Sequence, residues 1–155
     1  MIVVSDTTAI SNLLTIGRTD LLITLFERVI IPPAVWTELL AFHPEVPDWL
    51  EVVTVSQGQR VRDYQRLVHA GEAEAIALAL EVHPDWLLID DSDGRRLAKQ
   101  EGTPVIGLMG VLLLAKEQGL LPSVKPLIDA LESLAGFYLS GAVRDEVLRL
   151  AGEGH

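Results

Sequence analysis

The chain of 155 residues contains no cysteine, which excludes disulfide bonds, thiol catalysis and cysteine zinc sites and leaves oxygen ligands for any metal. Its net charge of -10 at pH 7 opposes non-specific binding to nucleic acid, because that affinity comes from lysine and arginine. The hydrophobic fraction of 49% with only 5% aromatic residues predicts an aliphatic core, as in parallel strands that are buried on both faces.

We expect one domain over residues 1–150, because no segment rich in proline, glycine or serine interrupts the middle of the chain. Residues 151–155 are expected to fray. No apolar run approaches the ~20 residues that span a bilayer. The start of the chain also lacks a basic flank, a long apolar stretch and a cleavage site. These features predict a cytoplasmic protein without a membrane segment.

Short segments rich in β-branched residues alternate with helical patterns along the chain. Strands are expected at residues 2–5, 29–31, 52–55, 87–90 and 103–106. Helices are expected from residue 7 past residue 14 and at residues 20–26, 32–42, 57–68, 71–82, 92–101, 108–118, 124–134 and 140–150. This alternation predicts a three-layer α/β/α sandwich around a mostly parallel sheet of about five strands with right-handed crossovers.

Six carboxylates follow the expected strands or lie on the neighbouring helices. They are Asp6, Glu38, Glu72, Asp90, Asp91 and Asp93. Open α/β sheets bind ligands at the carboxyl ends of their strands, and clustered carboxylates repel one another unless a hard cation lies between them. If the strands that end at Asp6 and at Asp90 are parallel neighbours, the pattern predicts a magnesium site for phosphodiester cleavage.

Most of these acids also have a purely structural interpretation. Asp6 precedes a helix and is a favoured N-cap, which is the simpler interpretation of this residue taken alone. Glu38 projects from a mostly apolar helix face, so it needs either a salt bridge, a snorkelling side chain or a metal. Near residue 90, three acids in four positions exceed what helix capping requires.

Two glutamates lie close together on one helix. Glu72 shares a helical stripe with Ile76 and Ala79 and is predicted to point inward. Glu74 shares a stripe with Glu81 and is predicted to face solvent. Glu72 is therefore the better ligand candidate.

Half of the basic residues occur in two short segments near the acids. Of the twelve lysines and arginines, these six are Arg60, Arg62, Arg66, Arg95, Arg96 and Lys99. They form either a basic rim around an acidic pocket or ordinary solvated helix faces. The four histidines have no metal-ligand spacing, and we expect them to be structural or exposed.

Four ordered motifs resemble the PIN-domain family. They are Ser5-Asp6-Thr7-Thr8, residues 31–39 (IPPAVWTEL), residues 71–79 (GEAEAIALA), and residues 88–91 (LIDD) followed by residues 94–98 (GRRLA). The resemblance covers residues 2–121 and is strongest toward uncharacterised prokaryotic PIN proteins related to the toxin subunits of toxin–antitoxin pairs. It is specific because the four motifs occur in order at compatible spacing.

The resemblance implies an endoribonuclease that cleaves single-stranded RNA with Mg²⁺ or Mn²⁺, is often dimeric and is often blocked by a small antitoxin protein. Carried onto this chain, it implies that the catalytic acids are Asp6, Glu38, Glu72 and Asp91. The implied metal ligands are Asp6, Glu72 and Asp91, with Asp90 and Asp93 as further candidates. Substrate contacts are expected from Thr8, Arg95, Arg96 and Lys99.

Two alternatives remain open from the sequence. The same fold can serve as a non-catalytic interaction or oligomerisation module. A magnesium phosphohydrolase would need a second aspartate two residues after the first, and Thr8 occupies that position. Retention of all the acidic positions favours the nuclease.

Overall fold

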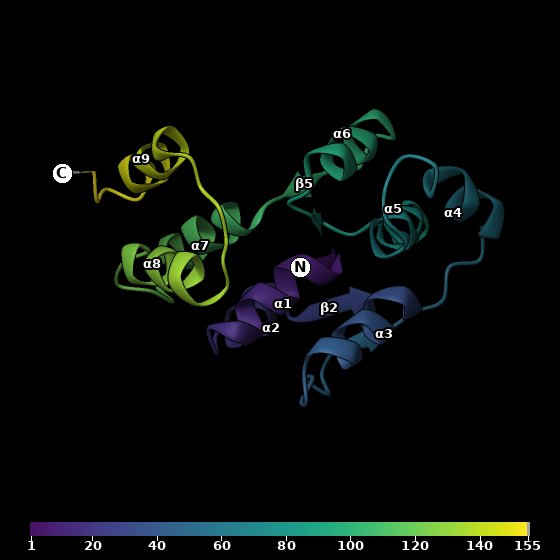
Figure 1. The fold of residues 1–155 in the computed structure, drawn as a ribbon, viewed down its shortest axis with the longest axis horizontal. Helices are drawn as coiled ribbons and strands as arrows, with labels where there is room; N and C mark the ends of the chain where they lie inside the picture. The colour runs from purple at the N-terminus through teal and green to yellow at the C-terminus, as the bar shows by residue number, and fades with distance from the viewer. Residues whose placement is uncertain (155) are drawn as a thin grey trace.

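The computed structural model describes residues 1–154. Its five strands are β1 (Ile2–Ser5), β2 (Arg28–Ile31), β3 (Glu51–Val52), β4 (Trp86–Leu88) and β5 (Val105–Ile106). The helices of this part of the chain are α1 (Thr7–Thr15), α2 (Asp20–Phe26), α3 (Pro33–Phe42), α4 (Gly58–Tyr64), α5 (Ala70–Val82), α6 (Ser92–Gln100), α7 (Leu108–Glu117), α8 (Lys125–Leu134) and α9 (Gly141–Leu150). Figure 1 shows their arrangement.

The five strands form one sheet in the order β3-β2-β1-β4-β5, and every neighbouring pair is parallel. In this order, β1 pairs with β4, with Ser5 opposite Leu88. The chain leaves β1 toward β2 and β3 on one side and returns to β4 and β5 on the other. The strand order therefore reverses between β1 and β4, which is where open α/β sheets place their ligand sites.

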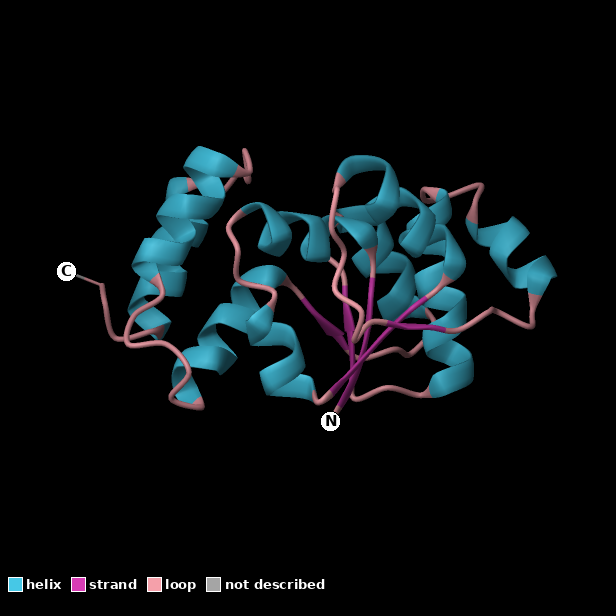
Figure 2. Cartoon of the chain, turned by 90° about the horizontal axis from the view of Figure 1, so that it is seen from below, coloured by secondary structure: helices cyan, strands magenta, loops and turns pink. Residues whose placement is uncertain are grey.

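Alternating side chains of the strands enter two separate cores, one on each face of the sheet. Val3 and Leu88 belong to a core formed mainly with α1, α2, α7 and α8. Val4 and Leu87 belong to a core formed mainly with α5 and α6. Figure 2 shows the strands between the two helical layers. The predicted three-layer α/β/α fold with a parallel five-stranded sheet is confirmed.

Several expected boundaries were wrong by a few residues. Helix α4 ends at Tyr64 rather than at Val68. The backbone turns after Tyr64, and the N atoms of Leu67 and Val68 both donate hydrogen bonds to Tyr64 O. Strand β5 begins after Pro104, which has no N–H to donate to a sheet. Strand β4 ends at Leu88, because the Asp90 side chain turns toward the start of α7.

In the part that the structure describes, the segment 151–155 that was expected to fray makes tertiary hydrogen bonds. Glu153 Oε2 accepts hydrogen bonds from Lys116 Nζ and from Val124 N, both at 2.9 Å. Glu153 Oε1 accepts from Lys125 N at 3.2 Å. The free backbone N–H groups at the start of α8 stabilise the negative charge of Glu153, so these hydrogen bonds attach the C-terminal segment to α8. His155 lies outside the described residues.

The membrane prediction concerns helix length and polarity. Within residues 1–154, the structure contains no helix with the length and apolar character needed to cross a bilayer.

Candidate active site

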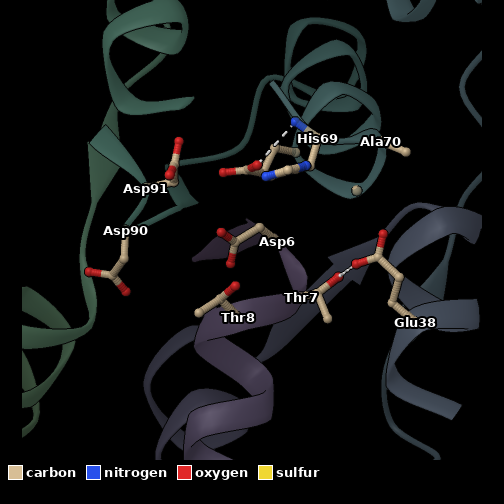
Figure 3. A pocket seen from close by; sticks show the side chains of 10 residues that line it. Asp6, Thr7, Thr8, Glu38, His69, Ala70, Asp90 and Asp91 are labelled. Atoms are coloured by element: carbon tan, nitrogen blue, oxygen red, sulfur yellow. Dashed lines mark hydrogen bonds between the residues drawn. The ribbon is translucent and has the colours of Figure 1, made fainter. Parts of the chain in front are cut away.

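A cavity of about 660 Å³ opens at the carboxyl ends of β1 and β4 (Figure 3). We call it the acidic cavity. Its lining consists of Asp6, Thr7, Thr8, Glu38, His69, Ala70, Gly71, Glu72, Asp90 and Asp91. Five of these residues are carboxylates and none is lysine or arginine. The fold thus brings together five of the six acids that the sequence singled out.

Asp6 lies at the centre of the carboxylate group, directly after β1. Its side chain is only 1% exposed, and its backbone N donates to Leu88 O at 3.1 Å. Asp6 Oδ1 accepts from Ala9 N at 3.2 Å, which makes Asp6 the N-cap of α1. Asp6 Oδ2 is buried without a hydrogen-bond partner in the described structure. Capping therefore explains one oxygen of Asp6 and leaves the other without a partner.

Glu38 enters the cavity from α3 and contacts α1 and α5. Its Oε2 accepts a hydrogen bond from Thr7 Oγ1 at 2.5 Å, where the sequence had suggested a salt bridge, a snorkelling side chain or a metal. A Cβ atom at Gly71 would lie 2.9 Å from each carboxylate oxygen of Glu38. Thr7 and Gly71 together define the position of this carboxylate.

Glu72 lies in the first turn of α5 and is 9% exposed, which confirms that it points inward. Its Oε1 accepts from the backbone N of His69 at 3.2 Å. Its Oε2 lies 3.2 Å from the position that a Cβ at Gly94 would take. The absence of a side chain at Gly94 therefore leaves room for Ile89 Cδ1, which would lie 2.6 Å from that Cβ, and for this carboxylate.

The predicted solvent stripe of Glu74 and Glu81 is wrong. Glu74 is half-buried, and its Oε1 accepts from Ala34 N at 3.2 Å. Glu81 accepts from the backbone N atoms of Ser56 and Gln57 at 2.9 Å. The stripe faces the starts of α3 and α4, where free backbone amides attract carboxylates.

Asp90 and Asp91 come from the turn after β4 and have different partners. Both oxygens of Asp90 accept from Leu108 N, at 3.0 and 3.1 Å, so this side chain holds the start of α7. Asp91 is the N-cap of α6, and its Oδ2 accepts from Gly94 N at 2.9 Å. Each acid thus combines a capping role with a place in the acidic cavity.

The structure does not bring Asp93 into the acidic cavity. Asp93 is exposed and pairs with Arg96 at 3.6 Å on the outside of α6. It lines a smaller hollow of about 280 Å³ beside Glu72 and Asp91. Helical geometry explains the separation, because Asp93 lies in the first turn of α6 while Asp91 precedes that helix.

Thr8 lines the acidic cavity, whereas the expected cationic contacts lie elsewhere. Arg95, Arg96 and Lys99 line a second cavity of about 890 Å³, which also contacts Asp90. Arg95 Nη1 donates to Ile89 O at 3.1 Å. Arg66 lines the smaller hollow beside Glu72 and Asp91, so basic residues lie beside the acids in both neighbouring cavities and none lines the acidic cavity itself.

Burial and mutual repulsion disfavour the charged form of the central acids. Burial raises the pKa of Asp6 well above its ordinary value, and the charges of Asp90, Glu72 and Asp91 raise it further. The pKa of Glu72 is raised by burial and then by the charge of Asp91. Burial also raises the pKa of Asp90, against the opposing effects of Leu108 N–H and Arg95. A cation in this cavity would relieve each of these penalties.

A sequence model described as a PIN domain matches residues 2–153. The chain belongs to the PIN-domain family. PIN domains are generally nucleases and usually use divalent metals. No curated protein matches this chain.

The donors of this PIN domain fit a hard divalent cation. They are carboxylate oxygens, and buried Asp6 Oδ2 has no other partner in the described structure. As the side chains stand, no three histidine, aspartate or glutamate residues within residues 1–154 converge closely enough to hold an ion. Ion binding therefore requires carboxylate rotation or water molecules as additional ligands, which is usual for Mg²⁺.

His69 is exposed, as expected, but it also lies at the site, which the sequence did not predict. It lines both the acidic cavity and the smaller hollow, and Figure 3 shows it beside Asp6. Its position three residues before Glu72 is the spacing of a capping box, which was the available signal. His43, by contrast, bonds to Ser11 Oγ at 2.7 Å, and exposed His83 ends α5.

The sequence also gave no indication that Gly107 contacts the site. A Cβ there would lie 2.8 Å from Asp90 Oδ1 and 2.9 Å from Arg95 Nη1. Gly71 has the same relationship to Glu38, and a Cβ at Gly94 would lie 3.2 Å from Glu72 Oε2 but closer, at 2.6 Å, to Ile89 Cδ1. Three acids of the cavity thus each lie against the bare backbone of a glycine.

Proposed function

We propose that this PIN domain is an Mg²⁺- or Mn²⁺-dependent endoribonuclease that cleaves single-stranded RNA. Family membership supports nuclease chemistry in general. The observation that carries the metal requirement is the buried oxygen Asp6 Oδ2, which has no partner within the described chain and is surrounded by other carboxylates. RNA as the substrate is favoured by the motif resemblance to toxin ribonucleases.

Asp6, Glu72 and Asp91 are the residues that would hold the cation. Such an ion supplies Lewis-acid stabilisation of phosphate charge and activation of water. Asp90 keeps its position through Leu108 N and brings the start of α7 to the same edge. These contacts fix the acids on rigid helix termini, which is what a preorganised site requires.

Glu38 is the acid best placed to orient the attacking water. It enters from the side of the cavity opposite Asp90 and Asp91, as Figure 3 shows, and Thr7 Oγ1 holds one of its oxygens. The other oxygen remains available to accept a proton from water. Glu38 therefore acts as the group that orients water and accepts its proton.

The experiment measures cleavage of a fluorescent single-stranded RNA with Mn²⁺, with EDTA, and with a DNA of the same sequence. Asp6→Asn should lower the rate by at least about 100-fold, because the variant removes a charged ligand while Asn can still cap α1. Asp145→Asn, an exposed change on α9, is the matched control. Cleavage that persists in EDTA, or that is equal for RNA and DNA, would refute the proposal.

The resemblance to toxin subunits also supports two proposals on assembly. A small antitoxin protein would block the acidic cavity, and the domain would form a homodimer. Light scattering on the purified protein tests the dimer. Copurification with the product of an adjacent short reading frame tests the antitoxin.

A further inference from the structure

A second cavity, which we call the side cavity, is lined by residues of β5, at the edge of the sheet, and of α6 and α7. Figure 1 shows α6 and α7 on either side of β5. Its volume is about 890 Å³. One wall carries the cationic residues Arg95, Arg96 and Lys99, and another carries Met109, Phe137 and Leu139. Asp90 lines both the side cavity and the acidic cavity, so the two cavities are neighbours.

Six of the twelve lysines and arginines of this acidic chain form close ion pairs, and none of these six lines the side cavity. Arg18, Arg28, Lys116, Lys125, Arg144 and Arg149 each form a close ion pair with a carboxylate. Lys99 has no such pair in the described part of the chain, and Arg96 has only the exposed contact with Asp93 at 3.6 Å. Exposed pairs of this kind are weak. Lys99 and Arg96 can therefore bind an external anion without breaking a strong contact.

The two cavities have opposite electrostatic character. The acidic cavity holds five carboxylates without a lysine or arginine, whereas the side cavity holds three cations and one carboxylate. That carboxylate, Asp90, is already bonded to Leu108 N and lies near Arg95. A phosphate group is thus repelled by the first cavity in the absence of metal and attracted by the second.

We propose that the side cavity binds the nucleotides next to the scissile phosphodiester of a single-stranded RNA. Arg96 and Lys99 contact the phosphates, and an unpaired base stacks on the ring of Phe137. Combined cationic and aromatic walls are how proteins bind single strands without reading their sequence. This inference rests on the proposed function, because it places the cleaved bond in the acidic cavity.

The aromatic wall distinguishes a nucleic acid from other anionic partners. An acidic peptide could use the same cations and could also pair with the open edge of β5. The ring of Phe137 beside the cationic side chains offers no particular interaction to an acidic peptide, but an unpaired base can stack on it. Stacking between neighbouring bases in a duplex covers the base faces, so a duplex should bind less well than a single strand.

The test is binding of a fluorescent single-stranded RNA of about ten nucleotides, followed by anisotropy in EDTA. Phe137→Leu keeps an apolar side chain against the core but removes the ring, and should weaken binding by about 5- to 50-fold. Lys99→Gln should weaken it several-fold and reduce the slope of log affinity against log salt by about 0.7. Melting curves of the variants verify that each is folded.

Two matched controls lie nearby. Tyr138 follows Phe137 in the sequence, is 84% exposed and does not line the side cavity, so Tyr138→Leu is the control for Phe137→Leu. Arg149, like Arg96, is exposed and pairs with an acid three residues earlier, at 2.6 Å rather than 3.6 Å, so Arg149→Gln removes the same charge from a helix away from the side cavity. Both controls should leave RNA affinity and its salt dependence unchanged, whereas Arg96→Gln should lower both.

Cleavage assays in Mn²⁺ separate this inference from the proposed function. If the wild type cleaves RNA while Phe137→Leu and Lys99→Gln bind like the wild type, the side cavity is not the binding site and the nuclease stands. If these variants lose affinity but the wild type never cleaves, the binding site stands and the nuclease fails. Equal binding of single strand and duplex, or equally strong competition by polyglutamate, overturns the proposal.

Discussion

Gly71 and Glu38 lie against each other at the edge of the acidic cavity, although 33 positions separate them in the sequence. A Cβ at Gly71 would approach both carboxylate oxygens of Glu38 to 2.9 Å. Because a carboxylate is the mobile end of its side chain, it can move away from such an atom. The backbone of α5 therefore determines where the Glu38 carboxylate lies.

Gly71→Ala should lower cleavage without destabilising the protein. Alanine is favoured over glycine in a helix by about 1 kcal/mol, which offsets the displacement of Glu38. Moving a catalytic group by about 1 Å can reduce the rate by about 100-fold. We expect kcat/KM to fall at least about 10-fold with an unchanged or higher Tm. Gly141→Ala in the first turn of α9, where a Cβ meets open space, is the control and should affect neither activity nor fold.

We predict that Glu72 is required for cleavage, whereas Glu74 contributes only to stability. Glu72→Gln should reduce metal-dependent cleavage by orders of magnitude, because it removes a buried charge from the cavity. Glu74→Gln keeps an oxygen that can accept from Ala34 N and should retain activity. Glu74→Ala loses that bond and should lower the unfolding free energy by about 1 kcal/mol. An inactive Glu74→Gln beside a fully active Glu72→Gln would reverse the assignment.

The sequence was sufficient to predict the sheet and the convergence of the main acids. Asp6 and Asp90 each follow an apolar run, and parallel pairing of β1 with β4 then places both at one edge. Helical phase was likewise sufficient to turn Glu72 inward. These predictions succeed because they depend on local periodicity and on a general rule of sheet topology.

The sequence was insufficient wherever a residue's role depends on a distant neighbour. Helical phase placed Glu74 on one stripe with Glu81, but nothing local shows that this stripe faces Ala34 N rather than solvent. Gly94 and Gly107 look like ordinary helix and loop residues until the tertiary fold places Glu72 and Asp90 against them. Such contacts depend on the packing of residues that are distant in the sequence, so local sequence patterns do not predict them.

Asp6 predicts a specific pH dependence of stability in the absence of metal. Because burial and neighbouring charges raise the pKa of Asp6 in the folded state, the fold favours its protonated form. This contribution is fully present below the unfolded pKa of about 3.9 and is lost as pH rises through the raised folded pKa. Asp6→Asn mimics the protonated form, so its stability advantage over the wild type should grow with pH in EDTA and then level off.

Urea unfolding of the wild type and Asp6→Asn in EDTA, from about pH 4 to about pH 8, measures this difference. Saturating Mn²⁺ should reduce or reverse the advantage, because the cation stabilises the carboxylate of the wild type. Asp145→Asn should show no such trend. A difference between Asp6→Asn and wild type that is independent of pH would mean that Asp6 titrates alike in the folded and unfolded states.

Asp90 and Asp91 differ in how much of each carboxylate is committed to a helix start, and this difference predicts their roles. Both Asp90 oxygens face Leu108 N, and the charge of Asp90 raises the pKa of Asp6 but not that of Glu72, whereas the charge of Asp91 raises the pKa of both. Asn can replace either cap, so the two Asp→Asn variants compare charge alone. At Mn²⁺ of about 100 times Kd, the wild type should gain about 5–10 °C in Tm. Asp91→Asn should lose most of that gain and Asp90→Asn less than half, and the opposite ranking would make Asp90 the principal ligand.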